Sequence, residues 1–383
     1  MFRTPENAIV IGLSGGIATG KSTALALLER IGNATVINAD LLGHEAYKPG
    51  TTCLEQLIQH FGVGILSEDG TVNRAALGPI VFADPEQMKS LNSIVWPSIR
   101  QLLKQQIHAI TESDPGVSFI VVEAAVLIEA GWVDIVDEVW VTLSSHEKQK
   151  MRLMSRNNLT AQDAETRIKS QISNEERIQV AHVRIWNDDD TAALEKTMND
   201  EIQKLKSRYA SPAAMEQVDI VDEHDQVVSS AKRATAYSFN MIIRCSFVVL
   251  IHKPTGQVYV QRRSKTKAVG PGVLDPAPGG VVGAKESYQA NATREMAEEM
   301  GIRGVSFEPI GALWIDDGKN RCWGHIFTAE ISTSVENLIL QDSEVQNVCL
   351  MSVADILNGD ESLYLNDGLA AFKHFCKLKN ALS

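Results

Sequence analysis

The chain has 383 residues, of which 44% are hydrophobic, and a formal net charge of -12 at pH 7. This length exceeds the roughly 250 to 300 residues at which single hydrophobic cores stop growing, so we expect two domains. The acidic balance argues against a nucleic-acid partner, because phosphate backbones are bound mainly through excess Lys and Arg. Small phosphorylated ligands need only local positive groups and stay compatible with this charge.

The spacing of the cysteines and the length of the apolar runs indicate the cellular compartment and whether the chain crosses a membrane. The chain has five cysteines without a CxxC pair, which disfavours a zinc site and a disulfide framework. The start, MFRTPENAIVIGL, lacks the basic and apolar regions of a signal peptide, and no apolar run reaches about 18 residues. We therefore expect a cytoplasmic protein without a membrane span. Its oligomeric state is not predicted.

Short apolar runs alternate with amphipathic segments through the first half of the chain. The runs AIVIGL, TVINAD, SFIVVEA and DEVWVTL read as buried strands, with long helical stretches between them. This alternation predicts an α/β domain over residues 1–208, with a parallel sheet flanked by helices.

A phosphate-binding loop follows the first predicted strand. The run Gly15-Gly-Ile-Ala-Thr-Gly20-Lys21-Ser22 opens the helical segment KSTALALLERIG. In such loops backbone N–H groups surround the phosphates, the Lys reaches the β and γ oxygens, and the Ser hydroxyl binds Mg²⁺. The alternative is a glycine-rich turn without a ligand. We predict that nucleotide contacts come from Gly15, Gly16, Ile17, Ala18, Thr19, Gly20, Lys21, Ser22 and Thr23, with Ser22 also a metal ligand.

Four segments of the first domain, one of which contains this loop, resemble a known family. GLSGGIATGKST, VINADLLGHEAYKPG, GTVNRAALGPIVFADPEQMKSLNSIVWPSI and FIVVEAAVLIEAGW resemble dephospho-CoA kinases in order and spacing, over about residues 8–207. The similarity looks closest to the kinase domain of the eukaryotic bifunctional CoA synthase. It implies a P-loop kinase that uses ATP and Mg²⁺ to phosphorylate the 3′-hydroxyl of dephospho-CoA, the last step of CoA biosynthesis. A different small metabolite as acceptor is the alternative.

The resemblance also implies roles for single residues. Asp40 falls where the family has the proposed base for the ribose hydroxyl, although Asp often caps helices instead. Asn38 stands where relatives commonly carry Asp. Arg152 and Arg156 match an arginine pair before the lid, and their spacing of four places them on one helix face, which could equally be solvated. Weaker candidates are Arg167 and Gln171 in the lid helix and Glu123, at a strand end, as a water-mediated Mg²⁺ contact.

A change of pattern near residue 210 indicates a second domain. The segment 209–215, YASPAAM, is small, polar and Pro-bearing, so we predict a linker there. Strand-like runs QVDIVD, MIIRCSFVVLIH and QVYVQRR follow, then one Glu-rich helical segment and further strands. This order predicts an α+β domain over residues 216–383.

A second motif lies in this domain. Gly280-x5-Glu286-x7-Arg294-Glu295-Met-Ala-Glu298-Glu299-Met-Gly301-Ile302 satisfies every fixed position of the Nudix box, so the domain is identified as a Nudix hydrolase domain. On a helix Glu295, Glu298 and Glu299 lie at i, i+3 and i+4, where like charges repel unless a cation gathers them. We predict that all three bind Mg²⁺ or Mn²⁺ and that Glu298 and Glu299 are catalytic, acting on an unidentified diphosphate-linked compound. The alternative is a nucleotide-sensing module without turnover.

Residues outside the box refine the prediction. The stretch from VDIVDEHDQVV to VYVQRRSKTKAVGPGVLDPAPGGVV resembles the Nudix subgroup shaped like isopentenyl diphosphate isomerase, but LDPAPGG replaces the Cys- and His-bearing run of the isomerase. We therefore expect hydrolysis rather than isomerisation. Glu286 and Arg294 are expected to hold the metal ligands in place. Arg262 and Arg263 are either phosphate contacts or exposed charges, and Glu344 is either an extra metal ligand or base, or part of a surface turn.

Overall fold

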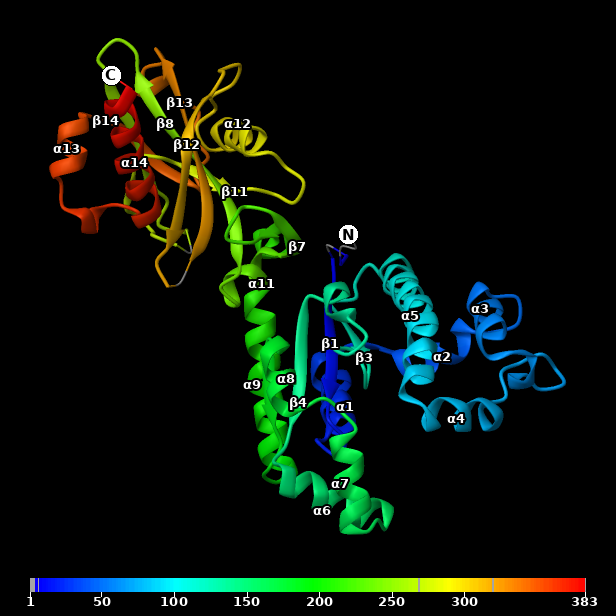
Figure 1. The fold of residues 1–383 in the computed structure, drawn as a ribbon. Helices are drawn as coiled ribbons and strands as arrows, with labels where there is room; N and C mark the ends of the chain where they lie inside the picture. The colour runs from blue at the N-terminus through cyan, green and yellow to red at the C-terminus, as the bar shows by residue number, and fades with distance from the viewer. Residues whose placement is uncertain (1–3, 6, 268, 319, 383) are drawn as a thin grey trace. The chain divides into compact units, whose positions relative to one another are not determined.

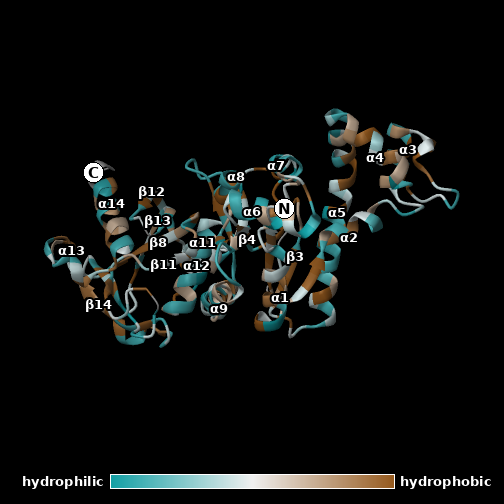
Figure 2. Cartoon of the chain, turned by 90° about the horizontal axis from the view of Figure 1, so that it is seen from below, coloured by the Kyte–Doolittle hydropathy of each residue, from teal (hydrophilic) through white to brown (hydrophobic). Residues whose placement is uncertain are grey.

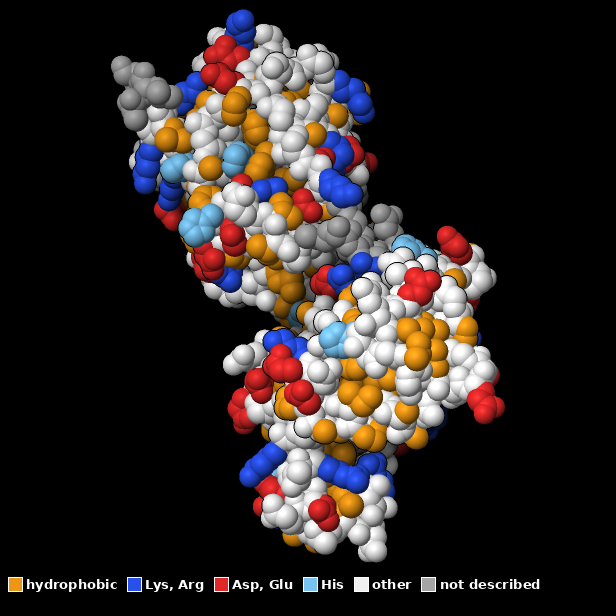
Figure 3. Space-filling view, turned by 45° about the vertical axis from the view of Figure 1, so that its right-hand side comes forward, with side chains coloured by type: hydrophobic (Ala, Val, Ile, Leu, Met, Phe, Trp, Pro, Cys, Tyr) orange, Lys and Arg blue, Asp and Glu red, His pale blue; other side chains and the backbone are white. Residues whose placement is uncertain are grey.

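The computed structural model describes residues 4–5, 7–267, 269–318 and 320–382 and divides the chain into two compact units, Met1–Met215 and Glu216–Ser383 (Figure 1). None of the described helices is long and apolar enough to cross a membrane. Acidic and basic side chains are interspersed on the face of each unit shown in Figure 3.

The first unit is an α/β domain with a five-stranded parallel sheet in the order β2-β3-β1-β4-β5. This confirms the predicted fold class. Its strands are β1 (Ile9–Gly15), β2 (Thr35–Asn38), β3 (Phe119–Glu123), β4 (Glu138–Leu143) and β5 (Val183–Trp186). Its helices are α1 (Lys21–Gly32), α2 (Ala39–Ala46), α3 (Thr52–Phe61), α4 (Arg74–Ala83), α5 (Pro85–Ser113), α6 (His146–Asn157), α7 (Ala161–Lys169), α8 (Asn174–Val180), α9 (Thr191–Arg208) and α10 (Pro212–Met215).

Burial on both faces explains why the central strands are apolar throughout. Every residue of β1, β3 and β4 is buried, and β3 is mostly brown in Figure 2, the colour of hydrophobic residues. Parallel sheets covered by helices have this composition. The long helix α5 buries Val95, Ile99, Leu103 and Ile107, a stripe at intervals of four residues, and it packs against α2, α3 and α4.

The segment predicted as a linker belongs to the first unit. Its first residue, Tyr209, is buried, and the Tyr209 hydroxyl lies 3.1 Å from Oε1 of Glu138. Arg208 also binds Glu138, and residues 212–215 form the short helix α10. Tyr209 is thus packed on the first unit, whereas residues 210–213 are exposed, and the division between the two units follows Met215.

The second unit has a seven-stranded mixed sheet and a separate two-stranded sheet, β6-β7. The path β10-β9-β8-β13-β12 is extended by β11, which pairs with β8, and by β14, which pairs with β9. Only the β8–β13 pair is parallel among these described pairings. The strands are β6 (Gln217–Val221), β7 (Val227–Lys232), β8 (Ile242–His252), β9 (Gln257–Arg263), β10 (Leu274–Asp275), β11 (Gly279–Val281), β12 (Glu308–Asp316), β13 (Arg321–Ile331) and β14 (Val345–Met351). The helices are α11 (Arg233–Ser238), α12 (Tyr288–Glu299), α13 (Val353–Asn358) and α14 (Asn366–Leu382).

Candidate active sites

The glycine-rich segment 15–20 forms a loop between β1 and α1. Gly20 has φ 96° and directly precedes α1, and Ala18 also has a positive φ, 62°. A Cβ at Gly20 would lie 2.1 Å from Nδ2 of Asn187, so only glycine fits there. The loop thus directs the N-terminus of α1 toward the adjoining cavity, the arrangement that binds phosphate groups.

Two distant side chains fix the backbone of this loop. Arg152, in α6, donates to the carbonyl oxygens of Ala18 at 3.2 Å and Asn187 at 2.8 Å. Asn187, after β5, donates from Nδ2 to the carbonyl of Thr19 at 2.9 Å. Sequence reasoning identified Arg152 but missed Asn187, because the loop motif carries no signal for a residue about 170 positions away.

The lysine of the loop is paired with the carboxylate at the end of β3. Nζ of Lys21 lies 2.5 Å from Oε1 of Glu123, and Nδ2 of Asn38 donates to Oε2 of the same carboxylate at 2.7 Å. Glu123 is buried, so both contacts offset the cost of removing its charge from water. Asn38 also caps α2 by accepting from the backbone N–H of Leu41. The helix cap considered for Asp40 is therefore supplied by Asn38.

A cavity of about 880 Å³ opens at the loop. Its lining includes both predicted arginines, Arg152 and Arg156, and Gln171, whose side-chain oxygen accepts from the backbone N–H of Ile17 at 2.8 Å. Eight predicted loop residues also line it: Gly15, Gly16, Ile17, Ala18, Gly20, Lys21, Ser22 and Thr23. The side chain of Thr19 points elsewhere, because it is buried against the carbonyl of Gly16 and the hydroxyl of Thr142.

Asp40 and Arg167 lie outside that lining. Asp40 is exposed in the first turn of α2, two residues beyond Asn38, and Arg167 is exposed in α7. The structure therefore brings the phosphate-binding loop, the arginine pair and Gln171 together. It places Asp40 after the carboxyl end of β2, which pairs with β3 and not with β1.

In the second unit, Arg294 lies at the centre of the acidic motif. Its guanidinium contacts Glu286 at 3.0 Å, Glu295 at 2.9 Å and Glu298 at 3.0 Å. Glu286 also accepts from the backbone N–H of Gly283 and from Asn291. Burial works to raise the pKa of Glu286, but these hydrogen bonds outweigh it and lower the pKa. Glu286 is thus a fixed anion that orients Arg294.

Glu299 faces a different cation. Nζ of Lys267 lies 3.6 Å from Oε1 of Glu299 and is bonded to Glu344. Burial raises the pKa of Glu299, and the positive charge of Lys267 partly offsets this rise. Burial lowers the pKa of Lys267, and the negative charge of Glu299 partly offsets this fall. The second carboxylate oxygen of Glu299, Oε2, is buried without a hydrogen-bond partner. Glu344 lies in a half-buried turn before β14, in keeping with the turn interpretation, and its carboxylate also joins this cluster through Lys267. Sequence reasoning missed Lys267.

Two glycines allow the strand β11 to approach its neighbours. A Cβ at Gly279 would lie 1.9 Å from the carbonyl oxygen of Ser246, and one at Gly280 would lie 2.3 Å from the carboxylate of Glu295. Burial raises the pKa of Glu295, which is packed between β11 and Arg294. Gly280 thus sets the distance between the sheet and the acidic face of α12.

The carboxylates of α12 do not converge as a ready metal site. Among the described residues no group of three or more His, Cys, Asp or Glu side chains is placed to hold a metal ion. Arg294 and Lys267 explain this finding, because each separates carboxylates that would otherwise repel. Oxygen donors and the unpartnered Oε2 of Glu299 nevertheless fit a hard divalent cation.

A buried carboxyl group without a sequence signal lies nearby. Asp275, in β10, is 2% exposed, and burial together with the neighbouring Asp367 raises its pKa to about 7. The guanidinium of Arg263 lies 3.9 Å from Oδ2 of Asp275.

Arg262 and Arg263 each bind the backbone of the loop between β9 and β10. Arg262 donates to the carbonyl oxygen of Gly272, and Arg263 donates to that of Val269. Both arginines therefore hold this loop in place.

The first unit is thus an α/β domain with a P-loop nucleotide site, and the second unit is an α+β domain with an acidic face on α12. The family model for dephospho-CoA kinase matches residues 9–193, and the model for the NUDIX domain matches residues 243–370. The chain is 44% identical over 191 residues to a dephospho-CoA kinase of Geobacter sulfurreducens, covering 50% of this chain and 95% of that relative. It is 39% identical over 188 residues to one of Carboxydothermus hydrogenoformans, covering 49% of this chain and 88% of the relative.

A solved dephospho-CoA kinase from Campylobacter jejuni is similar at 27% identity and a TM-score of 0.41, covering 52% of this chain and 97% of that one. On the sequence matches, the chain belongs to the dephospho-CoA kinase family, and it carries a NUDIX domain in its second unit.

Proposed function

We propose that the first unit transfers the γ-phosphoryl group of ATP to the 3′-hydroxyl of dephospho-CoA, giving CoA and ADP. The observation that carries this proposal is the loop cavity, where Lys21 and the N-terminus of α1 meet Arg152 and Arg156. These groups supply positive charge for the phosphates of ATP. Ser22, which lines the cavity, would hold Mg²⁺, and the ion supplies charge neutralisation during transfer.

The proton of the acceptor hydroxyl needs a base. In this reaction the P–O bond to ADP breaks, a new P–O bond forms at the 3′-oxygen, and the hydroxyl proton leaves. Asp40 is exposed, follows β2 and has no role as a helix cap, which supports its assignment as the acceptor of that proton. Asp40→Asn should lower kcat at least a hundredfold. Glu45→Gln, an exposed change in the same helix, is the matched control and should leave kcat unchanged.

The kinase proposal is tested by incubating the full chain with ATP, Mg²⁺ and dephospho-CoA and following CoA by mass. Wild type should form CoA, and Lys21→Ala should not. Absence of CoA with wild type would refute dephospho-CoA as the acceptor. A P-loop kinase for another small metabolite would then be the remaining assignment.

For the second unit we propose a divalent-metal-dependent hydrolase of a diphosphate-linked compound. Glu295, Glu298 and Glu299 would hold Mg²⁺ or Mn²⁺, which activates water and polarises the diphosphate when bound. Burial of Glu295 and Glu299 supports this assignment, since buried carboxylates without a full set of partners favour a cation. LDPAPGG, in place of the isomerase Cys and His run, favours hydrolysis within the isomerase-like subgroup.

A second candidate is a nucleotide-sensing module without turnover. It is favoured by Arg294 and Lys267, which already neutralise the carboxylates without a metal. A panel of nucleoside diphosphate derivatives, incubated with wild type and with the Glu298→Gln/Glu299→Gln variant, distinguishes the two. Hydrolysis of any compound by wild type alone supports the enzyme. Binding of a compound equally well by both proteins, with no hydrolysis, supports the sensing module.

A further inference from the structure

A buried arginine lies against the phosphate-binding loop with part of its guanidinium unpaired. Arg177, in α8, is 3% exposed, and its Nη1 group donates to the carbonyl oxygen of Ile172. A Cβ at Gly16 would lie 3.4 Å from Nη1 of Arg177. Gly16 lines the nucleotide cavity, so the guanidinium borders the wall of that cavity.

The unpaired atoms of Arg177 form one edge of the guanidinium. Nε and Nη2 are both buried and have no hydrogen-bond partner among the described residues. The N–H groups of these two nitrogens point the same way and match two oxygens of a carboxylate or a phosphate. Arg208 illustrates this geometry, because its Nε and Nη2 bind Glu138 at 3.0 and 2.9 Å. The same edge of Arg177 therefore selects an anion with two oxygens.

Two carboxylates supply counter-charge to Arg177 without occupying this edge. Burial lowers the pKa of the Arg177 guanidinium, and the negative charges of Glu129 and Glu176 oppose that shift. Glu176 accepts from the backbone N–H of Ser173 in the cap of α8. Oε2 of Glu129 is buried, without a hydrogen-bond partner in the part of the chain that the structure describes. Because a buried charge without a contacting partner is costly, the edge favours a bound anion.

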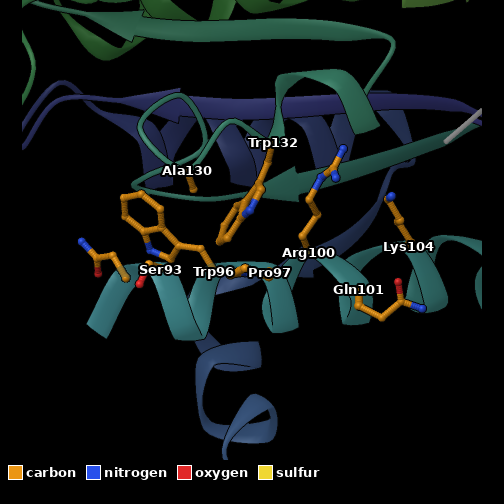
Figure 4. Close-up of a pocket in the computed structure, with 9 residues that line it drawn as sticks. Ser93, Trp96, Pro97, Arg100, Gln101, Lys104, Ala130 and Trp132 are labelled. Atoms are coloured by element: carbon orange, nitrogen blue, oxygen red, sulfur yellow. The ribbon is translucent and has the colours of Figure 1, made fainter. Parts of the chain in front are cut away.

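The segment that carries Glu129 is held by α5. Trp132, three residues further on, is 1% exposed and lines a cavity of about 300 Å³, in which Figure 4 shows it opposite side chains of α5. Arg100, in α5, also binds Asp134 of the same segment. These contacts hold the segment against α5 and oppose its movement toward α8. The free edge of the guanidinium is thus left to a ligand.

The residue that holds Arg177 adjoins one that holds the loop. Gln171 accepts from the backbone N–H of Ile17 at 2.8 Å, and the next residue, Ile172, accepts from Arg177. Backbone N–H groups of such loops bind phosphate oxygens. A phosphate that takes the Ile17 N–H from Gln171 would therefore also displace Ile172 and let the guanidinium turn toward the cavity.

We propose that Arg177 is a further catalytic residue of the kinase site, whose Nε–Nη2 edge binds the γ-phosphoryl group of ATP. This inference rests on the proposed kinase function. As the bond from the γ-phosphorus to ADP breaks, negative charge is spread over the three equatorial oxygens of the phosphoryl group. Two of these oxygens accept hydrogen bonds from Arg177, while Lys21 contacts the β and γ oxygens from the end of the loop.

The test compares nucleotides with and without a γ-phosphate. The full chain is titrated with ADP and with adenylyl imidodiphosphate, a non-hydrolysable ATP analogue, in the presence of Mg²⁺. Arg177→Gln should raise the Kd for the analogue roughly tenfold, leave the Kd for ADP within about twofold, and lower kcat at least about a hundredfold. Arg177→Lys keeps the charge but not the two-donor edge, so it should recover only part of the lost affinity.

Arg184→Gln is the matched control. Arg184 is exposed in β5 and donates to the carbonyl oxygen of Ile178 in α8, so its loss disturbs the same helix without touching the loop. This variant should keep the wild-type Kd for both nucleotides and the wild-type kcat.

The nucleotide comparison needs no acceptor, so it separates this inference from the kinase proposal. If wild type forms no CoA but Arg177→Gln selectively loses affinity for the analogue, the acceptor assignment fails and the Arg177 assignment stands. If CoA forms and Arg177→Gln keeps the wild-type kcat and Kd for the analogue, the Arg177 assignment is overturned. Equal weakening of ADP and the analogue would also overturn it, because Arg177 would then only support the loop. An equal loss of melting temperature in Arg177→Gln and Glu129→Gln, with unchanged nucleotide affinities, would instead assign the edge to Glu129.

Discussion

At the scale of single residues, the contacts of Asn38 explain why this chain has an amide at a position where relatives commonly carry Asp. Its oxygen caps α2 and its nitrogen donates to Glu123 at 2.7 Å. An aspartate would keep the cap but place a second carboxylate against Glu123. We predict that Asn38→Asp lowers the free energy of unfolding of the ligand-free chain by about 1–3 kcal/mol.

Denaturant unfolding checks this prediction, with Asn38→Ser as the control. Serine keeps a capping oxygen without adding charge, so it should cost less than the aspartate. Mg²⁺ and ATP should reduce the difference between the two variants, because a cation near Lys21 and Glu123 would screen the carboxylate pair. Equal stability of both variants without ligand would contradict the electrostatic explanation.

Lys267 is the second residue whose contacts carry a prediction. Its ammonium group contacts Glu299 and Glu344, so it supplies positive charge between two carboxylates. Lys267→Met removes this internal cation, so the metal-free chain should be less stable and should gain more from Mg²⁺. We expect a larger rise in melting temperature on adding Mg²⁺ than in wild type. The exposed change Lys253→Met should behave as wild type, and an unchanged Mg²⁺ response of Lys267→Met would show that Lys267 does not compete with a cation.

At the scale of elements, the packing of β11 against α12 controls the acidic motif. A methyl group at Gly280 would lie 2.3 Å from the carboxylate of Glu295, whereas one at Gly283 would lie 3.3 Å from the nearest oxygen of Glu286. Gly280→Ala should therefore displace Glu295 and weaken Mn²⁺ binding, measured by electron paramagnetic resonance, at least tenfold. Gly283→Ala should have a smaller effect. Equal effects of the two substitutions would show that the approach of β11 does not set the position of Glu295.

The same elements show what the sequence could reveal. The loop from Gly15 to Ser22 and the motif from Gly280 to Gly301 are contiguous, so their spacing alone predicts a phosphate loop and an acidic helix. The fully buried strands β1, β3 and β4 were equally visible, because burial on both faces requires apolar residues. The short strand β5, which is buried on one face only, was not predicted. Asn187 and Lys267 were not predictable, since each reaches its site through tertiary packing and neither belongs to a local pattern. Asn38 shows the same limit, because its contact with Glu123 joins residues 85 positions apart.

At the scale of the whole molecule, the two units contain buried titratable groups with opposite pH responses. In the first unit, burial and then Arg208 lower the pKa of His182 to about 4. The unfolded chain binds this proton below about pH 6.5, so stability is lost as the pH falls from 6.5 toward 4. In the second unit, burial, Asp367 and Glu299 raise the pKa of Asp275 to about 7, against the opposing effect of Arg263.

The sign for Asp275 is reversed, because its folded form holds a proton that the unfolded chain has already released above about pH 4. The contribution of Asp275 to the stability of the second unit should therefore fall by about 4 kcal/mol as the pH rises from 4 to 7, and the contribution of His182 to the first unit should fall by about 3 kcal/mol as the pH drops from 6.5 to 4. Hydrogen exchange of the full chain, followed by mass spectrometry, reports each unit from its own peptides. Asp275→Asn should flatten only the response of the second unit, and His182→Gln only that of the first. A response of both units to one substitution would show that their stabilities are coupled, because independent units titrate separately.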